Sequence, residues 1–144
     1  MNLSNLKAQC QQLEIKLQLD SQQLSQLNDM YQHELHGLKT TKAQLEQKQQ
    51  LHTAMAHQPV VVDPMLWQNK LKFALQLLTD IRLFELQVVE RQSATSQLAE
   101  KIAVILTRQK LMKERLKELE QETQIYLLER QQRQLQEVPR RLSC

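Results

Sequence analysis

Hydrophobic residues recur along the first 56 residues at alternating spacings of three and four. One row of them repeats every seven residues. It consists of Leu3, Cys10, Leu17, Leu24, Tyr31, Leu38 and Leu45. A heptad pattern of this kind buries one face of a helix against a second helix and leaves the remaining faces polar. The pattern predicts a long helix over residues 3–56 with a single buried seam.

A companion row lies between the members of the first and is interrupted by polar residues. Its hydrophobic members are Leu6, Leu13, Leu27 and Met55, and its polar members are Asp20, Glu34, Thr41 and Lys48. We interpret Asp20 and Glu34 as residues that set the register of the seam rather than as catalytic acids. The seam should be tight near the N-terminus and looser toward residue 56. Gly37 lies in the middle of this helix. Three interpretations are open: the helix bends there, a neighbouring segment approaches closely, or the helix merely tolerates the glycine.

A short break separates this helix from the rest of the chain. Residues 57–64 hold two of the three prolines, Pro59 and Pro64, and three consecutive valines at 60–62. Each proline lacks an N–H group and disfavours helical geometry in the residue before it, and valine favours extended backbone. Asp63 has the residue type of a helix N-cap, and Pro64 suits the first position of a helix. The break predicts the tip of a helical hairpin, with its apex near Val61.

The second helix is expected over residues 65–138, opened by Pro64 and stopped by Pro139, with a tail over 139–144. Two hydrophobic rows run along it. One begins at Trp67 and Leu71, and the other continues from Ile81 to Tyr126. They meet through consecutive steps of three at Leu78, Ile81 and Phe84, which predicts a local discontinuity of the seam.

These elements predict an all-α fold: one domain over 1–144, an elongated antiparallel two-helix coiled-coil hairpin with a longer second helix. At ~1.5 Å per residue the helices would be roughly 80 and 110 Å long. Folded at the tip, residue i should face about residue 121 − i, which places Leu3 beside Glu118. From about Glu120 onward, the second helix should have no partner within the chain.

Two groups of hydrophobic residues exceed what a two-helix seam needs. The first follows the tip, where Phe73, Leu77 and Phe84 form one line within an apolar stretch over 71–89. The second lies on the expected overhang and consists of Ile125, Tyr126, Leu127 and Leu128. Hydrophobic side chains on an unpaired helix face are typical of an interaction surface. We expect both groups to bind a partner. For the first group, self-association is the alternative; for the second, the alternatives are a fortuitous contact or a bend that folds the end of the helix back.

Composition and charge narrow the functional classes. Leu, Gln, Glu, Lys and Arg dominate the chain, as in long helices and coiled coils, and the formal net charge is only +3. The positive excess lies in residues 107–144, where nine basic residues are interleaved with six acidic ones. This arrangement does not indicate a nucleic-acid arm. No apolar run has the ~18–20 residues of a membrane span, and no signal peptide is visible. The two cysteines do not suggest a disulfide framework, so we expect a cytoplasmic protein.

The sequence contains no motif of an active site. There is no glycine-rich phosphate loop, no nucleophile motif and no cysteine pair with metal-ligand spacing. His33 and His36 lie three residues apart, but we interpret them as solvated histidines because no further ligand motif accompanies them. We therefore expect neither an enzyme nor a cofactor or metal.

The architecture resembles one known family. A hairpin of two long helices, a proline-containing tip, the sequence Leu66-Trp67-Gln68 just inside the second helix, and a second helix that extends beyond the first are similar to the YscO family of type III secretion proteins, relatives of flagellar FliJ. First helices of that family usually begin with a basic, arginine-containing segment, whereas residues 1–60 here contain no arginine.

The resemblance implies a non-enzymatic stalk or adaptor at the cytoplasmic base of a secretion apparatus. Proteins of this family engage the hexameric secretion ATPase, contact the export gate and bind secretion chaperones. By resemblance, residues 3–17 with 119–135 would enter the ATPase ring, and the line of Phe73, Leu77 and Phe84 would contact the gate. Two other hypotheses about the function remain open: a prefoldin-like holdase chaperone, and a homo-oligomeric structural coiled coil.

Overall fold

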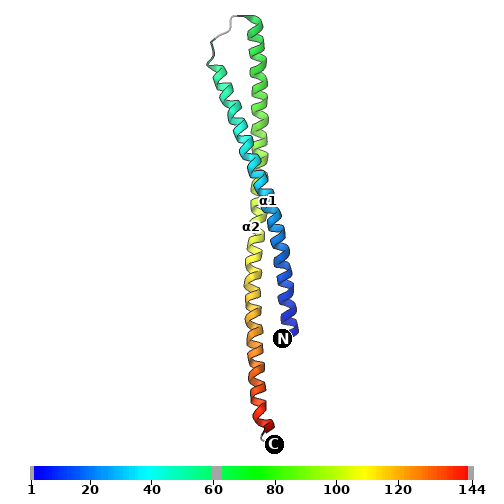
Figure 1. Ribbon diagram of the computed structural model, residues 1–144. Coiled ribbons are helices and arrows are strands. Elements are labelled where there is room, and N and C mark those ends of the chain that lie inside the picture. Colours follow the sequence, from blue (N-terminus) through cyan, green and yellow to red (C-terminus); the bar gives the residue numbers. More distant parts are fainter. Residues whose placement is uncertain (1, 60–62, 143–144) are drawn as a thin grey trace. The chain divides into compact units, whose positions relative to one another are not determined.

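Two long helices make up the fold. The computed structural model describes residues 2–59 and 63–142, with side chains described as far as residue 137 (Figure 1). Helix α1 spans Leu3–Ala56 (54 residues), helix α2 spans Pro64–Leu142 (79 residues), and no strand occurs among the described residues. This confirms the predicted all-α fold of two helices with a longer second helix.

Local hydrogen bonds explain why the helices begin where they do. At α2, the backbone N–H of Met65 donates to Asp63 Oδ1 (3.0 Å), and the N–H of Trp67 donates to the Asp63 carbonyl (2.9 Å). Asp63 is therefore the N-cap that the sequence predicted, with Pro64 in the first helical position. At α1, the N–H of Ser4 donates to Asn2 Oδ1 (3.3 Å) in the same manner. The expected apex at Val61, within 60–62, lies outside the described residues.

The C-terminal end of α2 differs from the prediction. The helix does not stop at Val138 but continues through Pro139 to Leu142. Proline has a φ angle near the helical value but no N–H to donate to the carbonyl four residues earlier, so this last part of the helix has one backbone hydrogen bond fewer. The expected tail is thereby reduced to residues 143–144, which lie outside the described residues.

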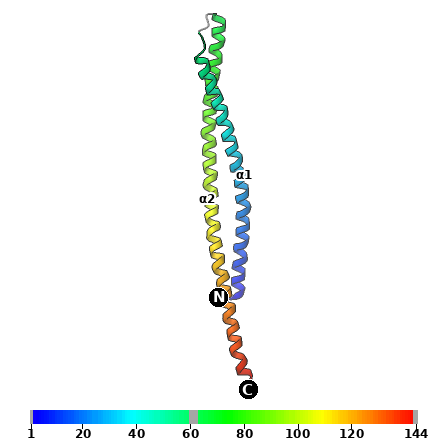
Figure 2. The same ribbon diagram turned by 60° about the vertical axis from the view of Figure 1, so that its left-hand side comes forward.

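The chain forms two compact units, each of which contains one segment of each helix. The end unit comprises Met1–Gln26 and Ile102–Cys144, and the tip unit comprises Leu27–Lys101. Within each unit, the segment of α1 runs antiparallel to the segment of α2 and lies beside it (Figure 2). The prediction of one domain over 1–144 stays a prediction.

The burial of α1 follows the predicted heptad. Every position of the two predicted rows is buried or half-buried, from Leu3 to Met55, including the polar positions Asp20, Glu34, Thr41 and Lys48. The seam positions beyond Thr41 are only half-buried, which agrees with the expected loosening toward the tip. On α1, the spacing of the residues was sufficient to identify the core.

The burial of α2 shows one continuous register instead of the two predicted ones. Its seam alternates strictly by four and three. The members are Lys70, Ala74, Leu77, Ile81, Phe84, Val88, Arg91, Thr95, Leu98, Ile102, Ile105, Gln109, Met112, Leu116, Leu119, Thr123 and Tyr126. The predicted discontinuity at Leu78 is wrong, because Leu77 occupies the seam and Leu78 is exposed. Polar residues such as Lys70 and Arg91 hold seam positions and thereby hide the register from a search for hydrophobic residues alone.

The two helices face each other about one heptad away from the predicted pairing. Asp20 was expected opposite residue 101, but in the end unit it contacts Arg108. Lys48 was expected opposite residue 73, but in the tip unit it contacts Asp80 at 3.8 Å. Each true partner lies seven residues beyond the predicted one. A shift of one heptad conserves the seam positions of both helices, so hydrophobic spacing does not distinguish the two pairings.

This shift changes the extent of the overhang. Lys7, Cys10 and Glu14 line a shallow hollow together with Glu120 and Gln124. Leu119 is fully buried, and Thr123 and Tyr126 are half-buried. The prediction that α2 has no partner from Glu120 onward is therefore wrong. Within the end unit, α2 is exposed at every position over 127–137.

Candidate protein-binding surfaces on the second helix

The line of Phe73, Leu77 and Phe84 does not form a single surface. Phe73 is 52% exposed, Leu77 is 2% exposed and Phe84 is half-buried. Leu77 belongs to the core of the tip unit, so its predicted role in binding a partner is wrong. The sequence placed Leu77 beside the seam of α2, whereas it lies within the seam. This error has the same cause as the misplaced register at Leu78. Of the three residues, Phe73 offers the largest part of its side chain to a partner.

The first turns of α2 are more exposed than the sequence indicated. Because the helices pair one heptad further along, the start of α2 extends past the end of α1. Trp67, predicted as a seam residue, is 50% exposed, and Met65 and Leu66 are exposed as well. Trp67 and Leu71 line a shallow hollow with Met55 of α1. This hollow is a candidate binding site that the predicted pairing hid, because that pairing placed Trp67 opposite α1.

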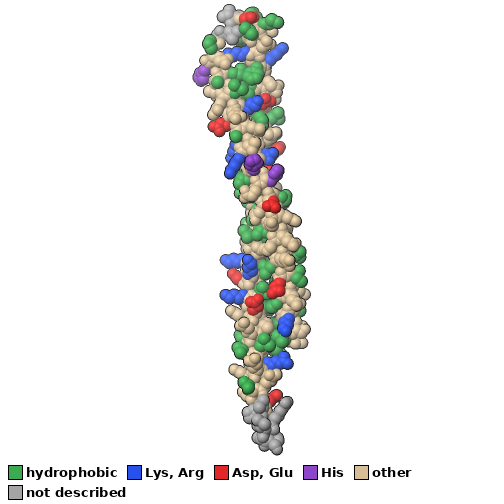
Figure 3. All heavy atoms as spheres, in the orientation of Figure 1, with side chains coloured by type: hydrophobic (Ala, Val, Ile, Leu, Met, Phe, Trp, Pro, Cys, Tyr) green, Lys and Arg blue, Asp and Glu red, His purple; other side chains and the backbone are tan. Residues whose placement is uncertain are grey.

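Further hydrophobic side chains lie on the outside of α2 in the tip unit. The exposed residues between Leu71 and Val89 are Leu71, Phe73, Leu75, Leu78, Leu83, Leu86 and Val89. Hydrophobic side chains are visible on the molecular surface among charged ones (Figure 3). On α1 of the same unit, only Met30 and Leu51 are large exposed hydrophobic residues. The hydrophobic surface of the tip unit thus belongs mainly to α2, as the sequence predicted for the stretch 71–89.

The second predicted group lies in the end unit, near the start of α1. Ile125, Leu127 and Leu128 are exposed, whereas Tyr126 is half-buried as the last seam residue of α2. The group is therefore divided: Tyr126 faces the seam, and the other three side chains face outward. Leu135 is a further exposed hydrophobic residue on this segment. Together Ile125, Leu127 and Leu128 form what we call the C-terminal surface.

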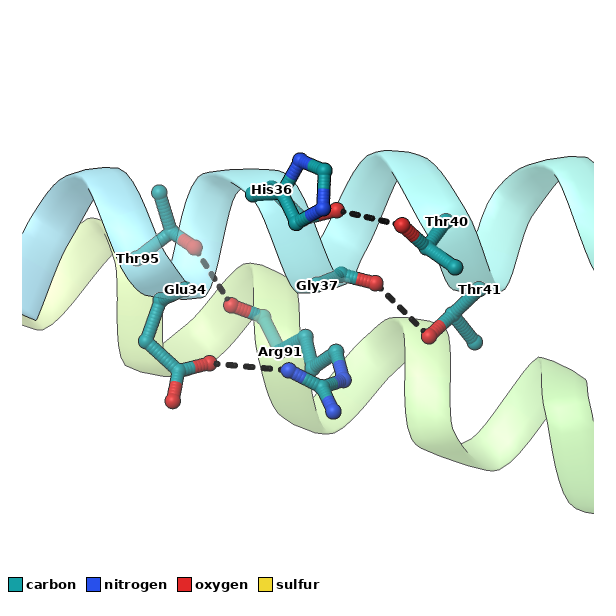
Figure 4. Close-up of polar contacts among 7 residues, drawn as sticks. All are labelled: Glu34, His36, Gly37, Thr40, Thr41, Arg91 and Thr95. Carbon is teal, nitrogen blue, oxygen red and sulfur yellow. Dashed lines mark hydrogen bonds and ion pairs between the residues drawn. The ribbon is translucent and has the colours of Figure 1, made fainter.

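Gly37 makes a close approach to α2, which was one of the interpretations open from the sequence. The guanidinium of Arg91 lies against α1 in the space that a Cβ atom at position 37 would occupy (Figure 4). The same guanidinium forms an ion pair with Glu34 at 3.6 Å. Thr41 Oγ1 donates to the Gly37 carbonyl (2.8 Å), and Thr95 Oγ1 donates to the Arg91 carbonyl (2.7 Å). Glycine thus allows an arginine at a seam position to turn toward a carboxylate.

The polar residues of the end-unit seam have hydrogen-bond partners. Arg108 donates from Nε and Nη2 to both carboxylate oxygens of Asp20, at 2.8 and 2.7 Å. The hydrogen bonds with Asp20, and its charge, raise the pKa of Arg108 above its ordinary value. Gln109 Nε2 donates to Ser21 Oγ at 3.0 Å. No buried side-chain nitrogen or oxygen atom among the described residues lacks a hydrogen-bond partner.

Potential metal ligands are not grouped in the part of the chain that the structure describes. The described residues contain no group of three or more His, Cys, Asp and Glu side chains that could hold a metal ion. His33 instead lines a shallow hollow in the tip unit with Met30 and Ala94. Neither described helix contains a stretch long and apolar enough to cross a membrane. The surfaces that distinguish this chain are therefore the hydrophobic ones on α2.

Comparisons with known proteins do not assign the chain to a family. No protein-family model matches it, and no curated protein and no solved structure shows significant similarity to it.

Proposed function

We propose that this chain is a non-enzymatic stalk or adaptor of a type III secretion apparatus. In this proposal it acts in the cytoplasm at the base of the apparatus, where it joins the secretion ATPase to the export gate and binds secretion chaperones. The support is the resemblance to the YscO family together with the distribution of hydrophobic surface on α2. Its action would be mechanical, because stiff paired helices can present binding surfaces without any catalytic group.

The observation that carries the proposal is the exposure of the C-terminal surface. Ile125, Leu127 and Leu128 are exposed on both sides of Tyr126 in the sequence, and α2 is exposed at every position over 127–137. Exposed hydrophobic side chains clustered on an uncovered helix mark a site for a protein partner. We assign this surface to the secretion ATPase. Phe73 and the half-buried Phe84, about three turns further along α2, are assigned to the export gate, and Leu77 is withdrawn from that surface.

The test is a pull-down from the cytoplasm of the source cell with the full chain and a Leu127→Glu, Leu128→Glu variant. The wild-type chain should retain a secretion ATPase, and the variant should lose it, because two carboxylates would have to be desolvated in a hydrophobic contact. The matched control is Val104→Glu, Leu111→Glu, which adds the same charges at two exposed positions of α2 outside the C-terminal surface.

Three results would contradict the proposal. If wild type and both variants retain the same mixture of unfolded proteins, the prefoldin-like chaperone is the better description. If the control variant loses the ATPase as completely as the test variant, the C-terminal surface is not its binding site. If the wild-type chain retains no secretion component, the resemblance is one of shape alone.

A further inference from the structure

A second heptad row runs along the outside of α2 in the tip unit. It lies one residue after the seam at every step, so that it occupies one flank of the helix. Its members are Leu71, Leu75, Leu78, Arg82, Glu85 and Val89. All six residues are exposed, and the four hydrophobic ones are 40–61% exposed. We call this row the outer row. It has the alternating spacing of a coiled-coil seam but no helix of its own unit covering it.

The outer row is separate from the surface assigned to the export gate. Phe73 and Leu83 each precede a seam residue, whereas the outer row follows the seam. Since successive residues are about 100° apart around a helix, residues before and after the seam lie on opposite flanks. A partner on Phe73 would therefore not occupy the outer row.

Two opposite charges interrupt the outer row at its fourth and fifth positions, toward its C-terminal end. Arg82 and Glu85 are exposed, and neither forms an ion pair within the described part of the chain. A hydrophobic partner surface would leave both charges desolvated and unpaired, which is costly. A partner with a glutamate opposite Arg82 and an arginine opposite Glu85 would satisfy both. A second copy of the same row has that arrangement when it runs antiparallel.

The antiparallel register follows from the charges. With Arg82 opposite Glu85 of the second copy, the twofold axis creates the same pair a second time. Leu78 then lies opposite Val89 of the second copy, again twice. A shift of one heptad that centres the hydrophobic residues instead places Arg82 opposite Leu78 and loses both ion pairs. A parallel arrangement places Arg82 against Arg82.

We propose that a second copy of this chain docks on the outer row, so that the two α2 helices run antiparallel in a contact centred between Arg82 and Glu85. This contact is independent of the proposed role in secretion, because it uses a different flank of α2 from Phe73 and a different unit from the C-terminal surface. In this register Leu78, Arg82, Glu85 and Val89 are self-complementary, whereas Leu71 and Leu75 face Ser96 and Gln92 of the second copy. The two charges select the partner and its direction.

A charge-exchange experiment tests the proposal directly. Sedimentation equilibrium of the full chain should show a species with twice the mass of one chain. The fraction of chains in this dimer should rise with protein concentration. Arg82→Glu alone and Glu85→Arg alone each place like charges opposite one another twice, so each should raise the dimer dissociation constant on the order of tenfold or more. The double variant Arg82→Glu, Glu85→Arg restores both pairs and should restore the dimer.

Two controls separate docking from folding. Leu83→Glu adds a charge at an exposed position on the opposite flank and should leave the dimer intact. Circular dichroism should show unchanged helix content in every variant. The proposal is overturned if the wild-type chain is monomeric at all concentrations. It is also overturned if either single variant dimerises as wild type does, or if the double variant fails to recover.

Discussion

Both units of the molecule join their helices by an acidic residue of α1 and an arginine of α2, yet the two contacts differ in geometry. In the end unit, Arg108 binds both oxygens of Asp20 at 2.7 and 2.8 Å, and the Asp20 side chain is only 11% exposed. In the tip unit, Arg91 meets Glu34 through a single contact of 3.6 Å, with the two side chains 38% and 30% exposed. The acidic partners, Asp20 and Glu34, occupy equivalent seam positions.

The difference shows that a polar residue in a seam can have two distinct consequences. A carboxylate that is withdrawn from water and held by two donors depends on its partner, because without it the buried charge would be unsatisfied. A pair joined by one long contact, with both side chains partly exposed, contributes less, because solvent screens it and both side chains lose freedom. We therefore expect Asp20 and Arg108 to matter for the stability of the molecule, and Glu34 and Arg91 to matter much less.

The largest effect is expected from Arg108→Met. This change retains the aliphatic part of the side chain but leaves the Asp20 carboxylate without its two donors, so the melting temperature should fall by several degrees. Thermal unfolding followed by circular dichroism measures it. In the double variant Asp20→Leu, Arg108→Met, the unpaired charge is absent, and most of the lost stability should return. If Arg108→Met is as stable as the wild-type chain, this account is contradicted.

A smaller effect is expected from Arg91→Met. The ion pair with Glu34 is single and solvated, so its loss should lower the free energy of unfolding by less than ~1 kcal/mol. Chemical denaturation of Arg91→Met and Arg108→Met side by side gives the comparison. If the two variants lose equal stability, the geometric difference between the two contacts has no energetic meaning.

The smallest net effect is expected from Gly37→Ala. Alanine gains up to ~1 kcal/mol of helix propensity, but its Cβ displaces the Arg91 guanidinium and weakens the pair with Glu34. Because the displaced group is the far end of a flexible side chain, stability should stay near wild type or rise slightly. In an Arg91→Met background the same substitution should show the full gain. Equal effects in the two backgrounds would show that Arg91 and Gly37 are not coupled.

Features that depend on neighbouring residues are predicted correctly from the sequence. Asp63 is identifiable as an N-cap because capping depends on a side chain and on backbone groups only two to four residues away. The seam of α1 is identifiable because its hydrophobic row is nearly complete. On α2, the predicted row from Ile81 to Tyr126 lies in the seam. Before Ile81, the polar residue Lys70 holds a seam position, and the register inferred from hydrophobic residues passed through Leu78 instead of Leu77.

The candidate surfaces were identified in part. The stretch 71–89 and the group at 125–128 do carry exposed hydrophobic side chains. However, Leu77 proved to be core, and Tyr126 proved to be the last half-buried seam residue of α2. Trp67 was assigned to the seam and is half exposed. These errors share one origin, since a hydrophobic side chain near a seam looks the same in sequence whether it faces the seam or the solvent.

The sequence by itself determined the two helices, the start of each, the break between them and the seam of α1, because these depend on interactions within a few residues and on a regular spacing. Only the tertiary structure decided that the seam of α2 before Ile81 passes through Leu77 rather than Leu78, and by how many heptads the helices are offset. A shift of seven residues leaves every hydrophobic position on the same face, so periodicity cannot select between pairings. Specific contacts between distant residues, such as Asp20 with Arg108 and Lys48 with Asp80, make that selection.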